Sequence, residues 1–236
     1  MFAGPNGSGK STIKDHSKLP SKLLGVYINP DELEAAVRAD GRLPLGPYGV
    51  TAGDTEVRDW FAVATSSRQN ALINAATEMS CRDNTIDFGG VAVNSYHASM
   101  LAEFLREKLI ATRTSFSFET VMSHSKKVEL LQDARADGYR TYLYFVATED
   151  PAINVTRVRS RVAQGGHDVP EAKIVERYAR SLGLLREAIR HTDRAYFFDN
   201  SGAEPWFFAE VTSGRTLEFQ SDEMPNWFKL AVSDKF

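Results

Sequence analysis

The residues best suited to chemistry lie near the start of the chain, in the stretch Gly4-Pro5-Asn6-Gly7-Ser8-Gly9-Lys10-Ser11-Thr12. A glycine, four free positions and then Gly-Lys-Ser match the phosphate-binding loop pattern without a mismatch. Glycines let the backbone approach a polyphosphate closely, and they permit positive φ where the loop must curl. The stretch therefore predicts a nucleoside triphosphate site, for which a chance glycine-rich turn is the alternative.

Two side chains in this loop are expected to have separate roles. A helix beginning near Gly9 directs its unpaired N–H groups and its positive dipole end at the anion. Lys10 then reaches the β- and γ-phosphates, and the Ser11 hydroxyl becomes a ligand of Mg²⁺. The expected nucleotide contacts in the loop come from Gly4, Asn6, Gly7, Ser8, Gly9, Lys10, Ser11 and Thr12.

Carboxylates follow two of the predicted strands, where ligands of open α/β sheets bind. Asp31 comes after the apolar run 23–28, and Glu119 closes the alternating run 114–120. A kinase needs a carboxylate near the γ-phosphate to accept the proton of the attacking hydroxyl. Asp31 is the candidate base, although capping of the following helix is an open alternative for it. Glu119 is the candidate at the substrate site.

A third group of candidates is basic. Arg157 and Arg161 stand one helical turn apart and share a face, and the pair Gly165-Gly166 follows them. Such a break suits the hinge of a lid over 157–185, and arginines commonly stabilise the charge of a transferring phosphoryl group. A solvated helix face is the alternative. His167, in the same loop, is either solvated or in contact with a phosphate.

The elements that must position these residues alternate between strands and helices. Apolar runs predict strands at 1–3, 23–28, 114–120, 142–147 and 195–199, with helices between them. This alternation predicts a three-layer α/β fold of the P-loop kinase type, with a mainly parallel five-stranded sheet. We expect one domain over 1–236, with a helical insertion at 39–95 and a terminal β-hairpin at 206–219.

Composition narrows the class of protein. The 236 residues are 42% apolar and 25% charged, as in ordinary globular domains. A net charge of −3 does not favour nucleic acid as a partner. The single cysteine, Cys81, excludes an internal disulfide framework and a cysteine-based zinc site. No apolar run approaches the length of a membrane span, so we expect a cytoplasmic protein without a membrane partner.

With these residues placed, the chain resembles the zeta-toxin-like family of P-loop kinases, in its short chromosomal branch of predicted ATPases. The resemblance runs in order along nearly the whole chain, and residues 39–95 contribute little to it. The motifs that carry it are the loop 4–12, Asn29-Pro30-Asp31, the segment 117–124, Arg157 with Arg161, the segment 165–170, Arg177-Tyr178 with Arg180-Ser181-Leu182, and Phe198-Asp199-Asn200-Ser201.

The resemblance implies a kinase that uses ATP and Mg²⁺ to phosphorylate a hydroxyl of UDP-N-acetylglucosamine. It also implies an antitoxin protein that blocks the nucleotide site of this kinase. It implies Asp31 as general base and Lys10 as the loop lysine. The remaining implied roles are charge stabilisation by Arg157 and Arg161, nucleotide contact by Asn200, and substrate contact by Glu119, Thr120 and His167. Thr120-Val121 replaces the family's Gly-Thr type of sequence, and the second lid arginine falls at or near His167. Both departures lie where the substrate and the γ-phosphate would bind, and they weaken the expectation of a sugar-nucleotide acceptor more than that of a kinase.

Other classes of nucleotide-binding protein fit less well. A mechanical ATPase needs a Leu-Ser-Gly-Gly-Gln signature and a GTPase needs Asn-Lys-x-Asp, and the sequence has neither. A nucleic-acid kinase would use the arginines between 177 and 194, but acidic residues interleave with them as on a solvated helix. A P-loop ATPase with a regulatory or nucleic-acid-associated role stays the alternative to a small-molecule kinase. Among kinases, the acceptor could be a nucleotide sugar or a dinucleotide.

Overall fold

A computed structural model describes residues 1–16, 19–66, 78–166 and 168–235. The chain forms two compact units. The first contains Met1–Leu19 and Glu119–Phe236, and the second contains Pro20–Phe118. Strand β6 (Phe116–Thr120) begins in the second unit and ends in the first.

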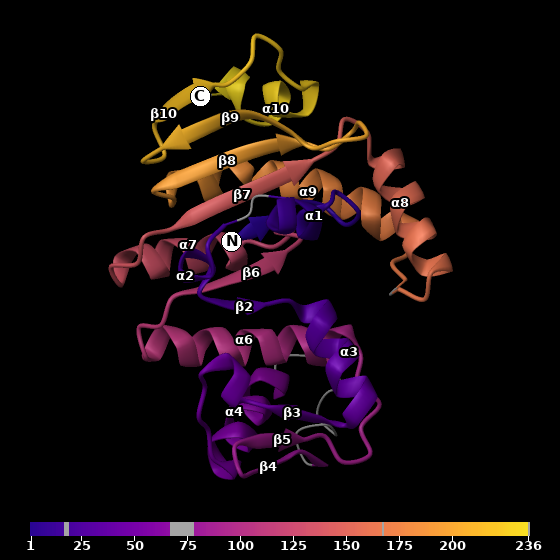
Figure 1. The fold of residues 1–236 in the computed structure, drawn as a ribbon, viewed down its shortest axis with the longest axis vertical. Helices are drawn as coiled ribbons and strands as arrows, with labels where there is room; N and C mark the ends of the chain where they lie inside the picture. The colour runs from indigo at the N-terminus through magenta and orange to yellow at the C-terminus, as the bar shows by residue number, and fades with distance from the viewer. Residues whose placement is uncertain (17–18, 67–77, 167, 236) are drawn as a thin grey trace. The chain divides into compact units, whose positions relative to one another are not determined.

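A mainly parallel sheet forms the centre of the first unit (Figure 1). Strand β1 pairs in parallel with the end of β6 on one side and with β7 on the other, and β7 pairs in parallel with β8. The last two strands extend this sheet in antiparallel fashion, as a hairpin. The strands are β1 (Phe2–Ala3), β7 (Tyr142–Ala147), β8 (Arg194–Asp199), β9 (Trp206–Thr212) and β10 (Thr216–Phe219).

Aromatic side chains line both faces of this sheet, because neighbouring residues of a strand point to opposite faces. On one face, Tyr144 stacks between Phe2 and Tyr196, with ring centroids 5.0 and 4.9 Å away. On the other face, the Phe228 ring lies 4.9 Å from Phe197 and 5.0 Å from the ring of Phe208. Phe228 belongs to the last α-helix, so the end of the chain packs into the core of the sheet.

The helices of the first unit connect the strands and cover the sheet. Along the longest of them, α9, buried residues recur every three or four positions from Ile174 to Ala188, the spacing of one helical face. Ile174 also packs with Val155, Val158 and Val169, and so joins α9 to α8. The helices are α1 (Lys10–His16), α7 (Lys126–Ala136), α8 (Pro151–Ala163), α9 (Glu171–Arg190), α10 (Asn226–Ala231) and the 3₁₀ turn η3 (Ser233–Lys235).

The second unit combines helices with a small sheet of its own. Strand β2 pairs in parallel with the start of β6, with Ile28 beside Phe118. Helices α3 and α6 pack against each other, and the Arg106 guanidinium lies 5.0 Å from the centroid of the Phe118 ring. The elements are α2 (Ser21–Leu24), β2 (Val26–Ile28), α3 (Pro30–Asp40), β3 (Arg42–Pro44), η1 (Gly46–Tyr48), α4 (Asp54–Ser66), β4 (Ser80–Arg82), β5 (Thr85–Asp87) and α6 (Ser95–Ala111).

The small sheet, in the order β3-β5-β4, lies in the segment predicted as a helical insertion. Helices do occur there, but we did not predict these strands. Each strand has three residues, too few to display an alternating pattern. The hairpin between β4 and β5 turns at Asp83 and Asn84, with φ of 49° and 57°. Tight hairpins favour positive φ at both central residues, but this turn lacks the usual glycine.

The predicted fold class is confirmed. Strands β2, β6, β1, β7 and β8 are the five parallel strands, and β9 with β10 is the terminal hairpin. The second unit, Pro20–Phe118, extends beyond the predicted insertion 39–95 at both ends. None of the helices in the described ranges combines the length and the apolar character that a membrane crossing requires.

Candidate functional site: the phosphate loop and its supports

The loop between β1 and α1 has the conformation that its glycines predict. Gly4, Gly7 and Gly9 have φ of 146°, 74° and 96°, a region that other residues rarely adopt. A Cβ atom at Gly4 would lie 2.0 Å from the carbonyl oxygen of Val146, and one at Gly9 would lie 2.2 Å from the Asn200 amide nitrogen. The loop therefore folds only with glycine at these positions.

The side of the loop that would face the phosphates, called the inner side below, offers hydrogen-bond donors. Among the residues that the structure describes, the backbone N–H groups of Gly7 and Gly9 have no acceptor. The Ser8 hydroxyl, a further donor, is buried without a partner in the described ranges. The Asn6 side-chain oxygen is buried in the same way, but it can only accept a hydrogen bond and adds nothing to the donors. Buried polar groups are normally satisfied, so the loop is built for a ligand that can accept hydrogen bonds.

The Lys10 ammonium lies within the same loop. Its Nζ atom donates to the carbonyl oxygens of Gly4 and Pro5, both at 3.1 Å. Ser11 and Thr12 follow on the first turn of α1 with exposed side chains. The loop therefore presents a cation, unsatisfied N–H groups and a hydroxyl near one helix N-terminus, which together suit a phosphate with its metal ion.

Two asparagines hold the outer side of the loop. Asn200, directly after β8, donates from Nδ2 to the Ser8 carbonyl oxygen at 2.8 Å. Asn154, on α8, donates from Nδ2 to the Asn6 carbonyl oxygen at 2.6 Å. Sequence reasoning selected Asn200 but missed Asn154. The two partners of the latter bond are 148 positions apart, so no local pattern could reveal it.

The end of β6 lies beside the loop. Glu119 pairs in register with Phe2, and the N–H of Gly4 donates to the Thr120 carbonyl oxygen at 3.3 Å. The Glu119 side chain is buried. The Thr120 hydroxyl accepts from the N–H of Met122 at 3.1 Å, in a turn where Met122 has positive φ. Glu119 and Thr120, two of the three predicted substrate residues, thus stand next to the start of the phosphate loop.

The three arginines of α8 differ in their surroundings. Arg159 forms an ion pair of 2.5 Å with Glu171, and both side chains are exposed. Arg157 donates to the Gly202 carbonyl oxygen at 3.4 Å, and its Nη1 atom is buried without a hydrogen bond in the described ranges. Arg161 is half-buried, and Gly166 packs closely against its side chain. Arg157 and Arg161 are thus half-buried, whereas Arg159 is exposed. His167 lies outside the described residues.

A hydrogen-bonded cluster links the ends of β7 and β8 to α10. The Asp199 carboxylate accepts from the Ser201 N–H at 2.9 Å and from the Trp227 indole N–H at 2.8 Å. Glu149 accepts from the Asn226 N–H at 2.8 Å. These bonds fix the strand end that precedes Asn200, and the sequence gives no sign of them because α10 is distant along the chain.

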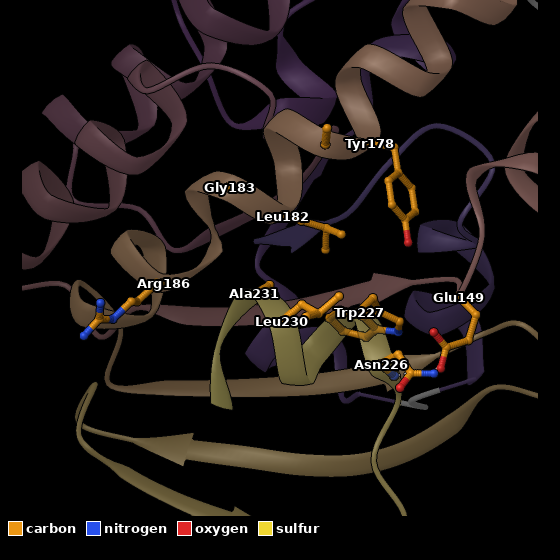
Figure 2. Close-up of a pocket in the computed structure, with 10 residues that line it drawn as sticks. Glu149, Tyr178, Leu182, Gly183, Arg186, Asn226, Trp227, Leu230 and Ala231 are labelled. Carbon is orange, nitrogen blue, oxygen red and sulfur yellow. Dashed lines mark hydrogen bonds between the residues drawn. The ribbon is translucent and has the colours of Figure 1, made fainter. Parts of the chain in front are cut away.

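A groove of about 480 Å³ lies between α9 and α10, next to this cluster (Figure 2). Tyr178 and Glu149 stand at one end and Arg186 at the other, with Leu182, Trp227 and Leu230 between them. The Tyr178 hydroxyl donates to the Thr148 carbonyl oxygen at 2.5 Å. Burial, with a smaller effect of neighbouring carboxylates, raises the pKa of Tyr178 well above its usual value, so the phenol stays protonated.

Asp31, the predicted base, belongs to the second unit. It follows Pro30 in the first turn of α3. The N-cap of that helix is Asn29, whose side-chain oxygen accepts from the Asp31 N–H at 3.0 Å. Asn29 is therefore the N-cap, and Asp31 lies in the first turn, where a negative charge also stabilises a helix. Its role as base stays a prediction.

Known proteins resemble the chain in sequence and in fold. A protein of Haemophilus influenzae, described as uncharacterised, is 25% identical over 179 residues, which cover 75% of this chain and 90% of that protein. Two crystal structures of AvrRxo1-ORF1 with ORF2, one with ATP and one with sulphate ions, superpose with TM-scores of 0.55 and 0.56 at 16% identity. The match covers 98% of this chain and 62% of theirs, so the chain spans less than two thirds of their length.

The family profile of zeta toxins matches residues 49–203. This range includes the end of β6, the arginines of α8 and the Asn200 turn, whereas the loop 4–12 and Asp31 precede it. The match covers most of the chain. The phosphate loop lies outside the matched range and is a second, independent observation. The chain belongs to the zeta toxin family.

Proposed function

We propose that the chain is an ATP- and Mg²⁺-dependent phosphotransferase of the zeta-toxin type, which transfers the γ-phosphoryl group of ATP to a hydroxyl of a small molecule. The observation that carries the proposal is the turn between β1 and α1. There, the Gly7 and Gly9 N–H groups lack acceptors in the described residues, and the Lys10 ammonium lies in the same loop. Family membership supports phosphoryl transfer as the use of this site.

The proposed reaction needs phosphate binding, proton transfer and charge stabilisation, and we assign different residues to each. The loop N–H groups and Lys10 bind the β- and γ-phosphates. Asp31 accepts the proton of the attacking hydroxyl. Arg157 and Arg161 stabilise the charge that spreads over the transferring phosphoryl group. Glu119 and Thr120, with His167, contact the acceptor, and Asn200 supports the nucleotide site through the Ser8 carbonyl.

The residues present fit a magnesium ion that is bound largely through the nucleotide. No group of three or more His, Cys, Asp or Glu side chains in the described ranges is arranged to hold a metal ion by itself. Mg²⁺ in kinases is held by few protein groups together with substrate phosphates and water. Ser11, exposed on the first turn of α1, is the residue that we assign to it. When bound, the ion neutralises charge on the phosphates.

The acceptor that we propose is of the nucleotide-sugar class, with UDP-N-acetylglucosamine as the first compound to test. The support for this class is family membership alone, and Thr120-Val121, at the acceptor side of the site, departs from the family's usual sequence. We also propose a protein partner of the antitoxin kind, because both similar crystal structures are complexes of ORF1 with ORF2. ATP and nucleotide sugars are cytoplasmic metabolites, so we propose the cytoplasm as the place of action.

The test combines nucleotide binding with transfer. Titration calorimetry should detect ATP binding to the wild-type protein in the presence of Mg²⁺. Lys10→Ala should abolish measurable binding, a loss of about a hundredfold or more, because the ammonium is the loop's charged donor. Lys14→Ala, four positions along α1, is the matched control and should bind ATP normally. Incubation with UDP-N-acetylglucosamine should then yield a phosphorylated sugar nucleotide and ADP. Equal ATP affinity in Lys10→Ala and wild type would contradict the site.

A further inference from the structure

The buried amide of Asn154 is held at both ends. The side chains of Asn154 and Thr148 are both fully buried. The Asn6 carbonyl can only accept a hydrogen bond, so Asn154 must present its NH₂ group to it, at 2.6 Å. The amide oxygen therefore faces the Thr148 hydroxyl, which donates to it. The Tyr178 hydroxyl in turn donates to the Thr148 carbonyl at 2.5 Å, so the chain of bonds runs from α9 to the phosphate loop.

This bond orients one N–H group of the loop. The Asn6 carbonyl and the Gly7 N–H belong to the same planar trans peptide group and point in opposite directions. When Asn154 holds the carbonyl outward, it directs the Gly7 N–H to the inner side, where that group has no acceptor among the described residues. Asn200 does the same for the Ser8 carbonyl and the Gly9 N–H.

The same residue fixes the arginine helix against the loop. A Cβ atom at Gly7 would lie 2.6 Å from the Asn154 carbonyl oxygen and 3.2 Å from a methyl group of Val158. The loop and α8 are therefore in direct contact without an intervening side chain. Arg157 and Arg161 follow Asn154 on this helix by one turn and two turns, so their distance from the loop is set at Asn154.

We propose that Asn154 is a positioning residue, which orients the Gly7 N–H toward the nucleotide phosphates and holds the arginines of α8 in register with the phosphate loop. This inference rests on the proposed function, since it assigns Asn154 to the same nucleotide site. It explains why a polar side chain occupies a fully buried position on α8, where an apolar residue would otherwise avoid the cost of desolvation.

Two variants separate this role from simple packing. Asn154→Leu keeps a similar shape and adds no charge near the phosphates, but it leaves the Asn6 carbonyl without its donor. Thr148→Val removes the hydroxyl that orients the Asn154 amide, together with its longer contact of 3.3 Å to the Asp150 carbonyl oxygen. Thr156→Val, on the exposed side of α8, is the matched control, because within the described part of the chain its hydroxyl donates only to the Ala152 carbonyl of its own helix.

Calorimetry with ATP and with AMP is the test, with thermal unfolding as a check of folding. Asn154→Leu should bind ATP about tenfold more weakly or worse, and Thr148→Val severalfold more weakly, as expected for loss of a buried hydrogen bond. The loss should be smaller for AMP, which lacks the β-phosphate that the loop amides contact. The Thr156→Val control should match the wild type with both nucleotides.

The outcomes distinguish this inference from the proposed function. Wild-type ATP affinity in folded Asn154→Leu and Thr148→Val would overturn the inference alone, as would a lower melting temperature with unchanged affinity. If Asn154→Leu does not fold, Thr148→Val decides by the same criterion. A wild-type protein that binds no ATP would overturn the proposed function and this inference together.

Discussion

Two turns in this molecule join a short parallel strand to a helix, and they differ in how the N–H groups near the start of the helix are used. Between β1 and α1, glycines with positive φ open the turn, and the Gly7 and Gly9 N–H groups have no acceptor in the described residues. Between β2 and α3, Asn29 closes the turn by accepting from the N–H of Asp31, and Pro30 removes another donor.

The difference teaches what each turn can bind. A helix N-terminus with open N–H groups attracts an anion from outside the chain. A helix N-terminus that is capped by its own asparagine does not need one, and its Asp31 carboxylate is not required for capping. The first turn is therefore suited to phosphate, and the second presents a carboxylate that can accept a proton. Variants that break one turn without the other test this division.

The largest expected effect is that of Asp31→Asn. Asparagine cannot accept the proton of the attacking hydroxyl, so phosphoryl transfer should fall by about 10²–10⁴-fold while ATP binding is preserved. The melting temperature should hardly change, because Asn29 and not Asp31 caps the helix. Transfer to the acceptor at the wild-type rate in this variant would show that another group is the base.

Arg161→Ala should have the next largest effect. Loss of a charge that stabilises the transferring phosphoryl group should lower kcat by about a hundredfold and weaken ATP binding much less. The control on the same helix is Arg159→Ala, which removes only an exposed ion pair with Glu171 and should leave kcat unchanged. Equal kcat values in the two variants at saturating ATP would make Arg161 a surface residue.

The smallest effect expected is that of Asn29→Ala on stability. Removing the side-chain cap of α3 should lower the free energy of unfolding by about 1 kcal/mol. Chemical denaturation measures this change directly, and Asn29→Ser, which retains a capping oxygen without placing a second carboxylate beside Glu32, should recover most of it. If Asn29→Ala unfolds at the wild-type denaturant concentration, the cap contributes nothing and the comparison of the two turns weakens.

Much of the fold could be predicted because its signals are local. The loop 4–12, the apolar strand 142–147 and the hairpin around Ser213-Gly214 each carry their information within a few residues. The supports of the loop could not be predicted in the same way. The bond from Asn154 to Asn6, and that from Trp227 to Asp199, join positions that only the folded sheet brings together.

Two further features of the structure could not be read from the sequence because the local signals were ambiguous. In Asn29-Pro30-Asp31, both Asn29 and Asp31 can cap a helix, and Pro30 at the first helical position decides in favour of Asn29. In the segment 80–87, a turn through Asp83 and Asn84 pairs two strands of three residues, a length at which periodicity carries no information. Helix spacing on either side of that segment dominated the prediction.

Product analysis of the wild-type protein tests the central claim most directly. The protein is incubated with ATP, Mg²⁺ and a cell metabolite extract, and mass spectrometry compares the products with those of Lys10→Ala. The account predicts one small molecule that gains a single phosphate as ADP is formed, in the wild-type reaction only. Release of ADP and inorganic phosphate by the wild type, with no phosphorylated metabolite, would contradict it and identify the chain as an ATPase.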